Sequence, residues 1–388
     1  MPSRSTSLCL AAALSASVVA GCGGSDSTST SSTGPTTTTA QKVDASGAKV
    51  VKLTLNDGAC APNQITTPAG PTTFEVTGGG TKKGKEIYFL DGTRVLGEIE
   101  QVDPGQTGKI TLNLAGGDFD LSCNNPGLES NGSLTVTGSN AAAESLGAAE
   151  KTAAEAYRQY LTEQTSLLTK QTIAFADAVK AGDMAKAKAL YGLARVPYER
   201  VEPVAESFGD LDPKIDAREG DVPLKQQTGF HVIEKALYKN NTLKGMKPFA
   251  DKLVADVKQL ETLVKDVPID PVQTANGAVE LLNEVSKSKI TGEEERFSGI
   301  DLLDFHANVQ GAQSAYDIVA PILKTKDGAL ASTVSDRFSA LYKRLDAYKQ
   351  GSGFVQYSTL DKADKTKLSQ SVDSLAEPLS QVPAHVVG

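Results

Sequence analysis

One short segment of the sequence places a histidine and a carboxylate where both could act on the same cation. In the stretch from Gly229 to Tyr238, His231 and Glu234 are three residues apart. On a helix this spacing puts an imidazole and a carboxylate on one face, and the apolar residues beside them give the helix a buried side. We predict that His231 and Glu234 belong to a metal site. The alternative is a surface ion pair, or a core histidine with its partner.

Acidic residues before this segment supply further oxygen ligands. Glu199, Glu202 and Glu206 follow the three- and four-residue spacing of one helix face. Carboxylates stacked in this way repel one another and raise one another's pKa, unless a cation or a basic group neutralises them. We therefore count Glu199 and Glu202 among the candidate metal ligands. The alternative is a solvated acidic helix with Arg195 or Arg200 as its counter-charge.

The predicted ligands define a class of metal. An oxygen-rich set with one imidazole suits Fe(III) or Fe(II), and it would also accept Zn(II) or Cu(II). A zinc peptidase would need HExxH or the inverted HxxEH, with a glutamate that activates a zinc-bound water. Lys235 stands where the inverted motif requires its second histidine. We therefore expect a metal-binding protein that is not an enzyme, with a metallopeptidase as the alternative.

The composition excludes some other functions. The 388 residues include 39 Lys and Arg against 47 Asp and Glu, a formal net charge of −8. The sequence has no basic run that could neutralise a phosphate backbone, so we expect no nucleic-acid partner. The length exceeds the roughly 50–200 residues of a usual domain, which predicts two domains or one very large one.

Residues 1–21 have the pattern of a secretory signal. One positive charge at Arg4 precedes an apolar run that is too short, and too rich in Ala and Ser, for a stable membrane span. The run ends in Val19 to Cys22, VAGC, which resembles the bacterial lipobox, where a peptidase cuts before the cysteine and that cysteine receives lipid. We predict an exported protein, lipid-anchored through Cys22 at the outer face of the cytoplasmic membrane or in the periplasm. An ordinary signal with a chance cysteine is the alternative.

Residues 22–41 are predicted to be a flexible tether. From Ser25 to Ala40, 12 of 16 residues are Ser or Thr, with no apolar periodicity and nothing to bury.

Two cysteines remain for the folded part of the chain, because Cys9 leaves with the signal and Cys22 is modified. In an oxidising, exported setting, Cys60 and Cys123 are expected to form a disulfide. Joint ligation of a metal by both is the alternative.

The segment from residue 42 to residue 138 has the pattern of an all-β domain. Short β-rich runs are separated by turns rich in Gly, Pro, Asn and Asp, which predicts an antiparallel β-sandwich. The runs cover residues 50–55, 72–76, 86–90, 109–114 and 133–136.

Four motifs in this segment resemble the cupredoxin-like domain of bacterial iron-uptake lipoproteins. They are Cys60 to Asn63, Pro68 to Phe74, the Pro104-Gly105 turn and Ser122-Cys123. A blue-copper site needs two His and one Cys, usually with a Met, and no His or Met lies between residues 42 and 138. Copper electron transfer is therefore excluded. The secondary metal candidates are carboxylates at Glu86, Glu98 and Glu100; the last two share a strand face, and solvated outward charges are the alternative.

From residue 141 to residue 388 the apolar periodicity becomes helical, and helix lengths near twenty favour an all-α bundle. The predicted helices cover residues 143–180, 184–207, 228–241, 247–266, 271–289, 301–324, 327–350 and 361–385.

This second domain resembles the imelysin-like family, also called the insulin-cleaving membrane peptidase family, as it occurs in bacterial iron-uptake systems. The motifs are Arg195 to Pro213, Gly229 to Leu237, Asn276 to Val285 and Lys289 to Arg296. The segment from Phe297 to Phe305 departs from the family pattern because it lacks a His and a Trp. The resemblance implies a metal site at the matching positions, which are His231, Glu234, Glu199, Glu202, Asp216 and Glu294.

The resemblance also implies a function and partners. It predicts an extracytoplasmic iron-binding component that passes iron to a membrane permease and works with a haem-dependent peroxidase. The β-domain would be an auxiliary metal or docking module. The third interpretation is binding of an acidic polysaccharide, as in one branch of the family, but a chain without Trp offers few stacking platforms.

Overall fold

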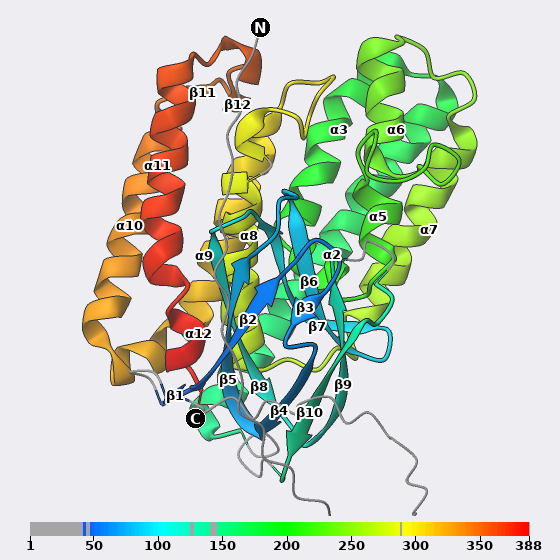
Figure 1. The fold of residues 1–388 in the computed structure, drawn as a ribbon. Helices are drawn as coiled ribbons and strands as arrows, with labels where there is room; N and C mark the ends of the chain where they lie inside the picture. The colour runs from blue at the N-terminus through cyan, green and yellow to red at the C-terminus, as the bar shows by residue number, and fades with distance from the viewer. Residues whose placement is uncertain (1–41, 44–46, 125–127, 140–145, 288, 388) are drawn as a thin grey trace, which may run out of the picture. The chain divides into compact units, whose positions relative to one another are not determined.

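The computed structural model describes residues 42–43, 47–124, 128–139, 146–287 and 289–387. The predicted signal segment, Cys22 and the whole of the predicted tether therefore lie outside the described residues. Strands come first along the chain and helices follow, from blue and cyan to green and red in Figure 1. Within the described part of the chain, no helix combines the length and the apolar character that crossing a membrane requires.

The strands form two five-stranded sheets, as a sandwich requires. The first has the order β1 (Lys42–Val43), β2 (Lys49–Leu55), β5 (Gly70–Gly78) and β8 (Thr107–Leu114), with β3 (Cys60–Ala61) on β2. The second has the order β4 (Gln64–Pro68), β10 (Gly132–Thr137), β9 (Gly117–Cys123), β6 (Lys85–Asp91) and β7 (Arg94–Val102). The pairs β2–β5 and β4–β10 are parallel, so the prediction of an antiparallel sandwich is wrong for these two pairs.

Alternating side chains from both sheets form one buried core. Phe74 on β5 and Phe89 on β6 pack with ring centroids 4.4 Å apart and planes tilted by 43°, and both are fully buried. Cys60 in the first sheet and Cys123 in the second form a disulfide. Apolar packing and a covalent bond thus both connect the two sheets.

All the helices except the short α5 occupy segments where helical periodicity was predicted. They are α2 (Ala148–Ala181), α3 (Met184–Glu199), α4 (Glu202–Glu206), α5 (Leu211–Asp216), α6 (Phe230–Glu234), α7 (Lys247–Leu263), α8 (Pro271–Lys287), α9 (Asp301–Lys326), α10 (Gly328–Asp346), α11 (Lys362–Leu379) and α12 (Val382–His385). Short elements between them are a π-helix η1 (Lys235–Lys239), the 3₁₀ turns η2 (Lys289–Thr291) and η3 (Tyr357–Thr359), and strands β11 (Lys349–Gln350) and β12 (Gly353–Phe354). Three predicted helices are interrupted, after Glu199, Glu234 and Leu379.

The long helices follow from their sequence pattern and caps. On α2, Tyr157, Leu161, Leu168 and Phe175 recur at helical spacing and are buried in the bundle core. The helix ends at Gly182, whose φ of 73° is the left-handed conformation that glycine adopts easily. The side chain of the next residue, Asp183, caps α3 by accepting from the Lys186 amide at 3.0 Å.

A glycine sets the position of the central histidine. Gly229 has a φ of 87°, and a Cβ built on it would lie 2.1 Å from the carbonyl oxygen of Ile215. Only glycine therefore allows the start of α6 to approach the end of α5 this closely. As a result, His231 on α6 lies beside Asp216, the last residue of α5.

Strands β7 and β8 contact the helical region. The Val95 amide donates to the Ser207 carbonyl at 3.2 Å, and the Asn276 side-chain amide on α8 donates to the Thr111 carbonyl at 2.7 Å. Asn276 is 6% exposed, so its hydrogen bond is shielded from water.

Candidate metal centre

His231 lies at the centre of a buried group of carboxylates. Its Nε2 atom lies 3.4 Å from Asp216 Oδ1 and 3.4 Å from Glu294 Oε1, and makes no hydrogen bond of normal geometry. All three side chains are buried, and one ligand atom of each lies within 4.8 Å of the others. A ring nitrogen that faces two carboxylate oxygens in this way could share a cation with them.

Glu234 contacts the other nitrogen of the same ring. Its Oε2 atom lies 3.2 Å from His231 Nδ1, while Oε1 accepts from the backbone amides of Phe297 at 2.8 Å and Ser298 at 2.7 Å. Burial alone would raise the pKa of Glu234, but the contact with His231 and these amides lowers it. Glu234 is thus placed to orient the imidazole, and Asp216 and Glu294 face the opposite edge of the ring.

A fully buried guanidinium occupies the space between the acids. Arg195 on α3 reaches the carboxylates of five residues, with its Nε atom 2.8 Å from Asp304 Oδ2. The five are Glu199, Asp216, Glu294, Glu295 and Asp304. Arg195 therefore does neutralise acidic side chains, as the alternative of a solvated acidic helix required. However, the arginine and these acids are buried and not solvated.

A second buried cation holds Glu199 and Glu202. Lys289 is 1% exposed, and its Nζ atom contacts Glu199, Glu202 at 2.8 Å and Glu284 at 3.1 Å. Glu199, Glu202 and Asp216 form a further group with ligand atoms within 4.8 Å of one another. All six residues of the predicted site thus lie in one continuous cluster, in which Asp216 links the histidine to the two glutamates.

The cluster holds more acids than permanent cations. Its buried carboxyl groups are Glu199, Glu202, Asp216, Glu234, Glu294, Glu295, Asp301 and Asp304. Against these eight stand the buried side chains of Arg195 and Lys289, and the half-buried Arg218, which contacts Glu294 at 2.9 Å. Burial is the main cause that raises the pKa of Glu199 to about 8 and that of Asp301 to about 6. This surplus of buried carboxyl groups over cations favours the binding of protons, or of a metal cation in place of protons.

The charge balance also affects the histidine. Burial works against a charged imidazole, but Asp216 and the contacts with Glu234 and Glu294 hold the pKa of His231 well above its usual value. These carboxylates therefore favour a proton on the metal-free ring, and a cation at Nε2 must replace it.

Four residues of this cluster were not predicted from the sequence. They are Lys289, Glu295, Asp301 and Asp304. A sequence signal exists for two of them, because Asp301, Asp304 and Asn308 recur at helical spacing on the buried face of α9. Polar residues on an otherwise apolar helix face are a pattern from which part of this buried cluster could have been predicted.

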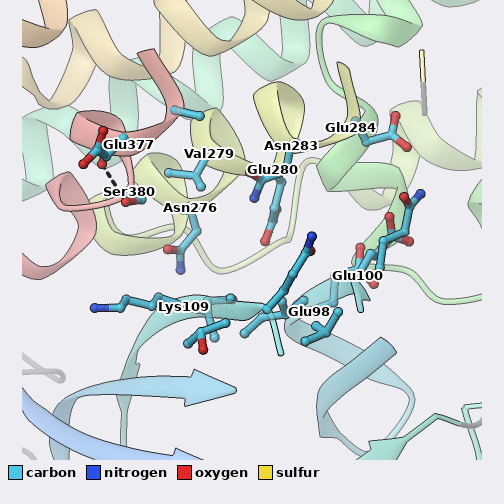
Figure 2. Close-up of a pocket in the computed structure, with 18 of the residues that line it drawn as sticks. Glu98, Glu100, Lys109, Asn276, Val279, Glu280, Asn283, Glu284, Glu377 and Ser380 are labelled. Atoms are coloured by element: carbon cyan, nitrogen blue, oxygen red, sulfur yellow. Dashed lines mark hydrogen bonds between the residues drawn. The ribbon is translucent and has the colours of Figure 1, made fainter. Parts of the chain in front are cut away.

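The secondary candidates in the β-domain lie around Tyr88. Glu86 accepts from the Tyr88 hydroxyl at 2.9 Å, and burial together with Glu98, Glu86 and Glu100 raises the pKa of that hydroxyl far above its usual value. Glu98 and Glu100 on β7 also line a cavity of about 340 Å³. Glu280 and Glu284 on α8 face them across this cavity (Figure 2).

The other two histidines lie away from His231. His306 packs against the rings of Tyr342 and Phe354, with centroids 5.8 Å and 5.2 Å away. His385 Nδ1 lies 2.8 Å from the Gln381 carbonyl oxygen. Since all three histidines belong to the described residues, the centre around His231 has one imidazole.

Two family models match the sequence, an imelysin model over residues 153–382 and a cupredoxin-like domain model over residues 32–136. The chain belongs to the imelysin family. The sequence-based predictions of an imelysin-like helical domain after a cupredoxin-like sandwich are thereby confirmed.

Curated relatives of this imelysin-family chain carry the name iron uptake system component EfeO. The Yersinia pestis protein is 40% identical over 352 residues, which cover 88% of this chain and 93% of the relative. The Escherichia coli O1:K1 / APEC protein is 40% identical over 348 residues, which cover 87% and 92%. Among solved structures, dithionite-reduced auracyanin from Roseiflexus castenholzii covers 23% of this chain and 97% of its own, with 16% identity and a TM-score of 0.21.

Proposed function

We propose that this protein captures iron outside the cytoplasm at the centre around His231 and passes it to a membrane permease. One observation carries the proposal: the Nε2 atom of His231 is buried and faces the oxygens of Asp216 and Glu294 without a hydrogen bond. A buried polar atom that makes no hydrogen bond of normal geometry is costly, and a cation shared with the two carboxylates would satisfy it.

Each residue of the predicted site has a separate role in this proposal. His231, Asp216 and Glu294 bind the cation, while Glu199 and Glu202 add carboxylate oxygens next to Asp216. Glu234 holds the imidazole ring by its Nδ1 atom. Such outer contacts fix the orientation of a metal-bound histidine. Arg195 and Lys289 compensate the acids while no metal is bound.

Two features support iron as the cargo. Carboxylate oxygens with one imidazole are a hard to intermediate donor set, which suits Fe(III) or Fe(II) and also accepts Zn(II) or Cu(II). The 40%-identical relatives are named as iron uptake system components. The proposed partners are a membrane iron permease and a haem-dependent peroxidase, and the VAGC motif at Cys22 supports a lipid anchor.

Metal titration by calorimetry tests this function. The mature protein, the His231→Ala/Glu234→Ala double variant and Asp216→Asn would be titrated with Fe(III)-citrate, Fe(II), Zn(II) and Cu(II), with citrate alone as a reference. We expect tight iron binding that the double variant loses and Asp216→Asn weakens. The matched control is His385→Ala, which removes an imidazole outside the centre and should bind as the wild type does.

Two results would contradict the proposal. Iron binding that is unchanged in the double variant would move the site to Glu86, Glu98 and Glu100, and a protein that never binds iron would end the hypothesis. Casein or insulin cleavage that His231→Ala abolishes would favour the metallopeptidase. An affinity for alginate far above that for iron would favour the polysaccharide-binding alternative.

A further inference from the structure

An arginine at the end of α3 lies in an open pocket on the helical bundle. Arg200 directly follows Glu199, and a pocket of about 430 Å³ surrounds its side chain. The residues that line the pocket with Arg200 are Tyr160, Gln164, Gln310, Gln313, Ser314 and Tyr342. These side chains come from α2, α9 and α10, and all six are uncharged amides or hydroxyls.

Neutral oxygens hold the guanidinium in place. Its Nε and Nη2 atoms donate to Gln310 Oε1 at 3.1 Å and 2.8 Å, and Nη1 donates to Gln164 Oε1 at 3.1 Å. An arginine has five N–H donors, so these three bonds leave two N–H groups for another acceptor. Amide oxygens orient the guanidinium but leave its charge uncompensated.

The environment of Arg200 differs from those of Arg195 and Arg218, the two arginines that contact the acids of the metal centre. Arg195 contacts five carboxylates, and Arg218 contacts Asp221 and Glu294 at 2.9 Å each. Among the described residues, no carboxylate lines the Arg200 pocket and none forms an ion pair with Arg200. In a chain of net charge −8, an oriented guanidinium without an acid is complementary to an anion from outside.

The walls of the pocket are preorganised. A Cβ on Gly311 would lie 2.4 Å from the Arg200 carbonyl oxygen, so this glycine lets α9 pack directly against the end of α3. The Tyr160 hydroxyl is buried and makes no hydrogen bond of normal geometry. It is thus a further donor beside the guanidinium, at low cost in side-chain ordering.

We propose that the Arg200 pocket binds the carboxylate group of a small organic anion. The planar fork of a guanidinium matches a carboxylate in two parallel hydrogen bonds, and the neutral amides and hydroxyls complete the ligand's hydrogen bonding. One positive charge balances one carboxylate, and the other carboxylates of citrate would stay in water outside this open pocket, whereas both charges of a phosphate dianion would enter it. The site does not depend on iron binding at His231, since the two sites share no side chain.

Calorimetric titration of the metal-free mature protein with citrate and with acetate tests the proposal, after metal has been removed with a chelator and the chelator dialysed away, with inorganic phosphate as the comparison anion. We expect both carboxylates to bind, and Arg200→Gln to weaken citrate at least about tenfold. The matched control is Arg337→Gln, which removes the same charge from an exposed position on α10 outside the pocket. It should leave the affinity unchanged.

A second variant covers the case in which Arg200→Gln does not fold. Gln313→Ala shortens one side chain that lines the pocket without removing a charge. It should lower the affinity for citrate several-fold, while the midpoint of thermal unfolding stays near that of the wild type. The proposal is overturned by a wild-type protein that binds neither carboxylate, or by equal losses in Arg200→Gln and Arg337→Gln, which would show diffuse attraction. Phosphate that binds more tightly than citrate would also overturn it.

Discussion

At the residue scale, the two nitrogens of His231 have separate tasks. Glu234 contacts Nδ1, and Nε2 faces Asp216 and Glu294. The spacing of His231 and Glu234 predicted that the two side chains would meet, and they do. It could not predict which nitrogen each carboxylate faces, because Asp216 and Glu294 come from segments that only the fold brings together.

Replacing Glu234 by Gln should weaken metal binding without disturbing the fold. The amide keeps an oxygen for the Phe297 and Ser298 N–H groups, but its NH₂ group then faces Nδ1. This donor favours the tautomer with hydrogen on Nε2, which blocks the metal-binding atom. We expect an iron affinity about 10–100-fold lower by calorimetry. An unchanged affinity together with an unchanged melting temperature would show that Glu234 does not position the ring.

Iron binding should release protons and weaken in acid. Burial opposes the charge on His231, but Asp216 and the neighbouring glutamates raise its pKa, so the metal-free ring carries a proton that the cation must displace. The affinity should therefore rise as the pH rises toward and above neutrality. Titrations in buffers of different ionisation enthalpy would measure the released protons. Binding that releases none would mean that iron does not replace the proton on His231.

At the element scale, the side chains of the metal centre lie at points where predicted helices are interrupted. The periodicity from residue 184 to residue 207 predicted one helix, but the chain interrupts it after Glu199 and starts α4 at Glu202, with Pro203 in its first turn. The segment predicted as one helix over residues 228–241 likewise changes to a π-helix after Glu234. These breaks depend on tertiary contacts around buried charges, which local apolar periodicity does not encode. The parallel pairing of β2 with β5 and of β4 with β10 was not predicted for a similar reason. The alternation of apolar and polar residues along a strand does not show which strand lies next to it.

Replacing Gly229 by Ala should destabilise the protein more than the same change at Gly182. Both glycines have positive φ, but a Cβ at residue 229 would lie 2.1 Å from the Ile215 carbonyl oxygen, whereas nothing lies within 4 Å at residue 182. Backbone strain alone costs about 1 kcal/mol, and the clash should raise the loss at Gly229 to about 3 kcal/mol. Urea unfolding would measure both. Equal losses would mean that the approach of α5 and α6 tolerates a side chain.

At the scale of the whole molecule, carboxyl groups extend from the centre toward the β-domain. Glu202, Glu206 and Glu284 form a third group with ligand atoms within 4.8 Å of one another, and Glu206 and Glu284 also line the cavity beside Glu98. Glu86, Glu98 and Glu100 were predicted from the sequence as a set, but only the structure places Glu98 and Glu100 in a cavity opposite α8 (Figure 2). The sequence pattern of a strand does not show which helix will pack opposite the sheet.

Glu280 in this cavity should make stability depend on pH. Burial raises its pKa to about 7, above the ordinary value of 4.5. Between these values the folded protein keeps the proton that the unfolded chain loses, so this group lowers the unfolding free energy as the pH rises, by at most about 1.4 kcal/mol per pH unit. Relative to wild type, Glu280→Gln should gain stability from pH 5 to pH 7. A difference that stays constant with pH in urea unfolding would contradict this.

The position of bound iron tests the central claim most directly. Crystals of the iron-loaded mature protein would be measured on both sides of the iron absorption edge. The account predicts an anomalous peak beside His231 Nε2, within reach of Asp216 and Glu294, that is absent from His231→Ala. A strong peak at Glu98, Glu206 or Glu284 with none at His231 would contradict it.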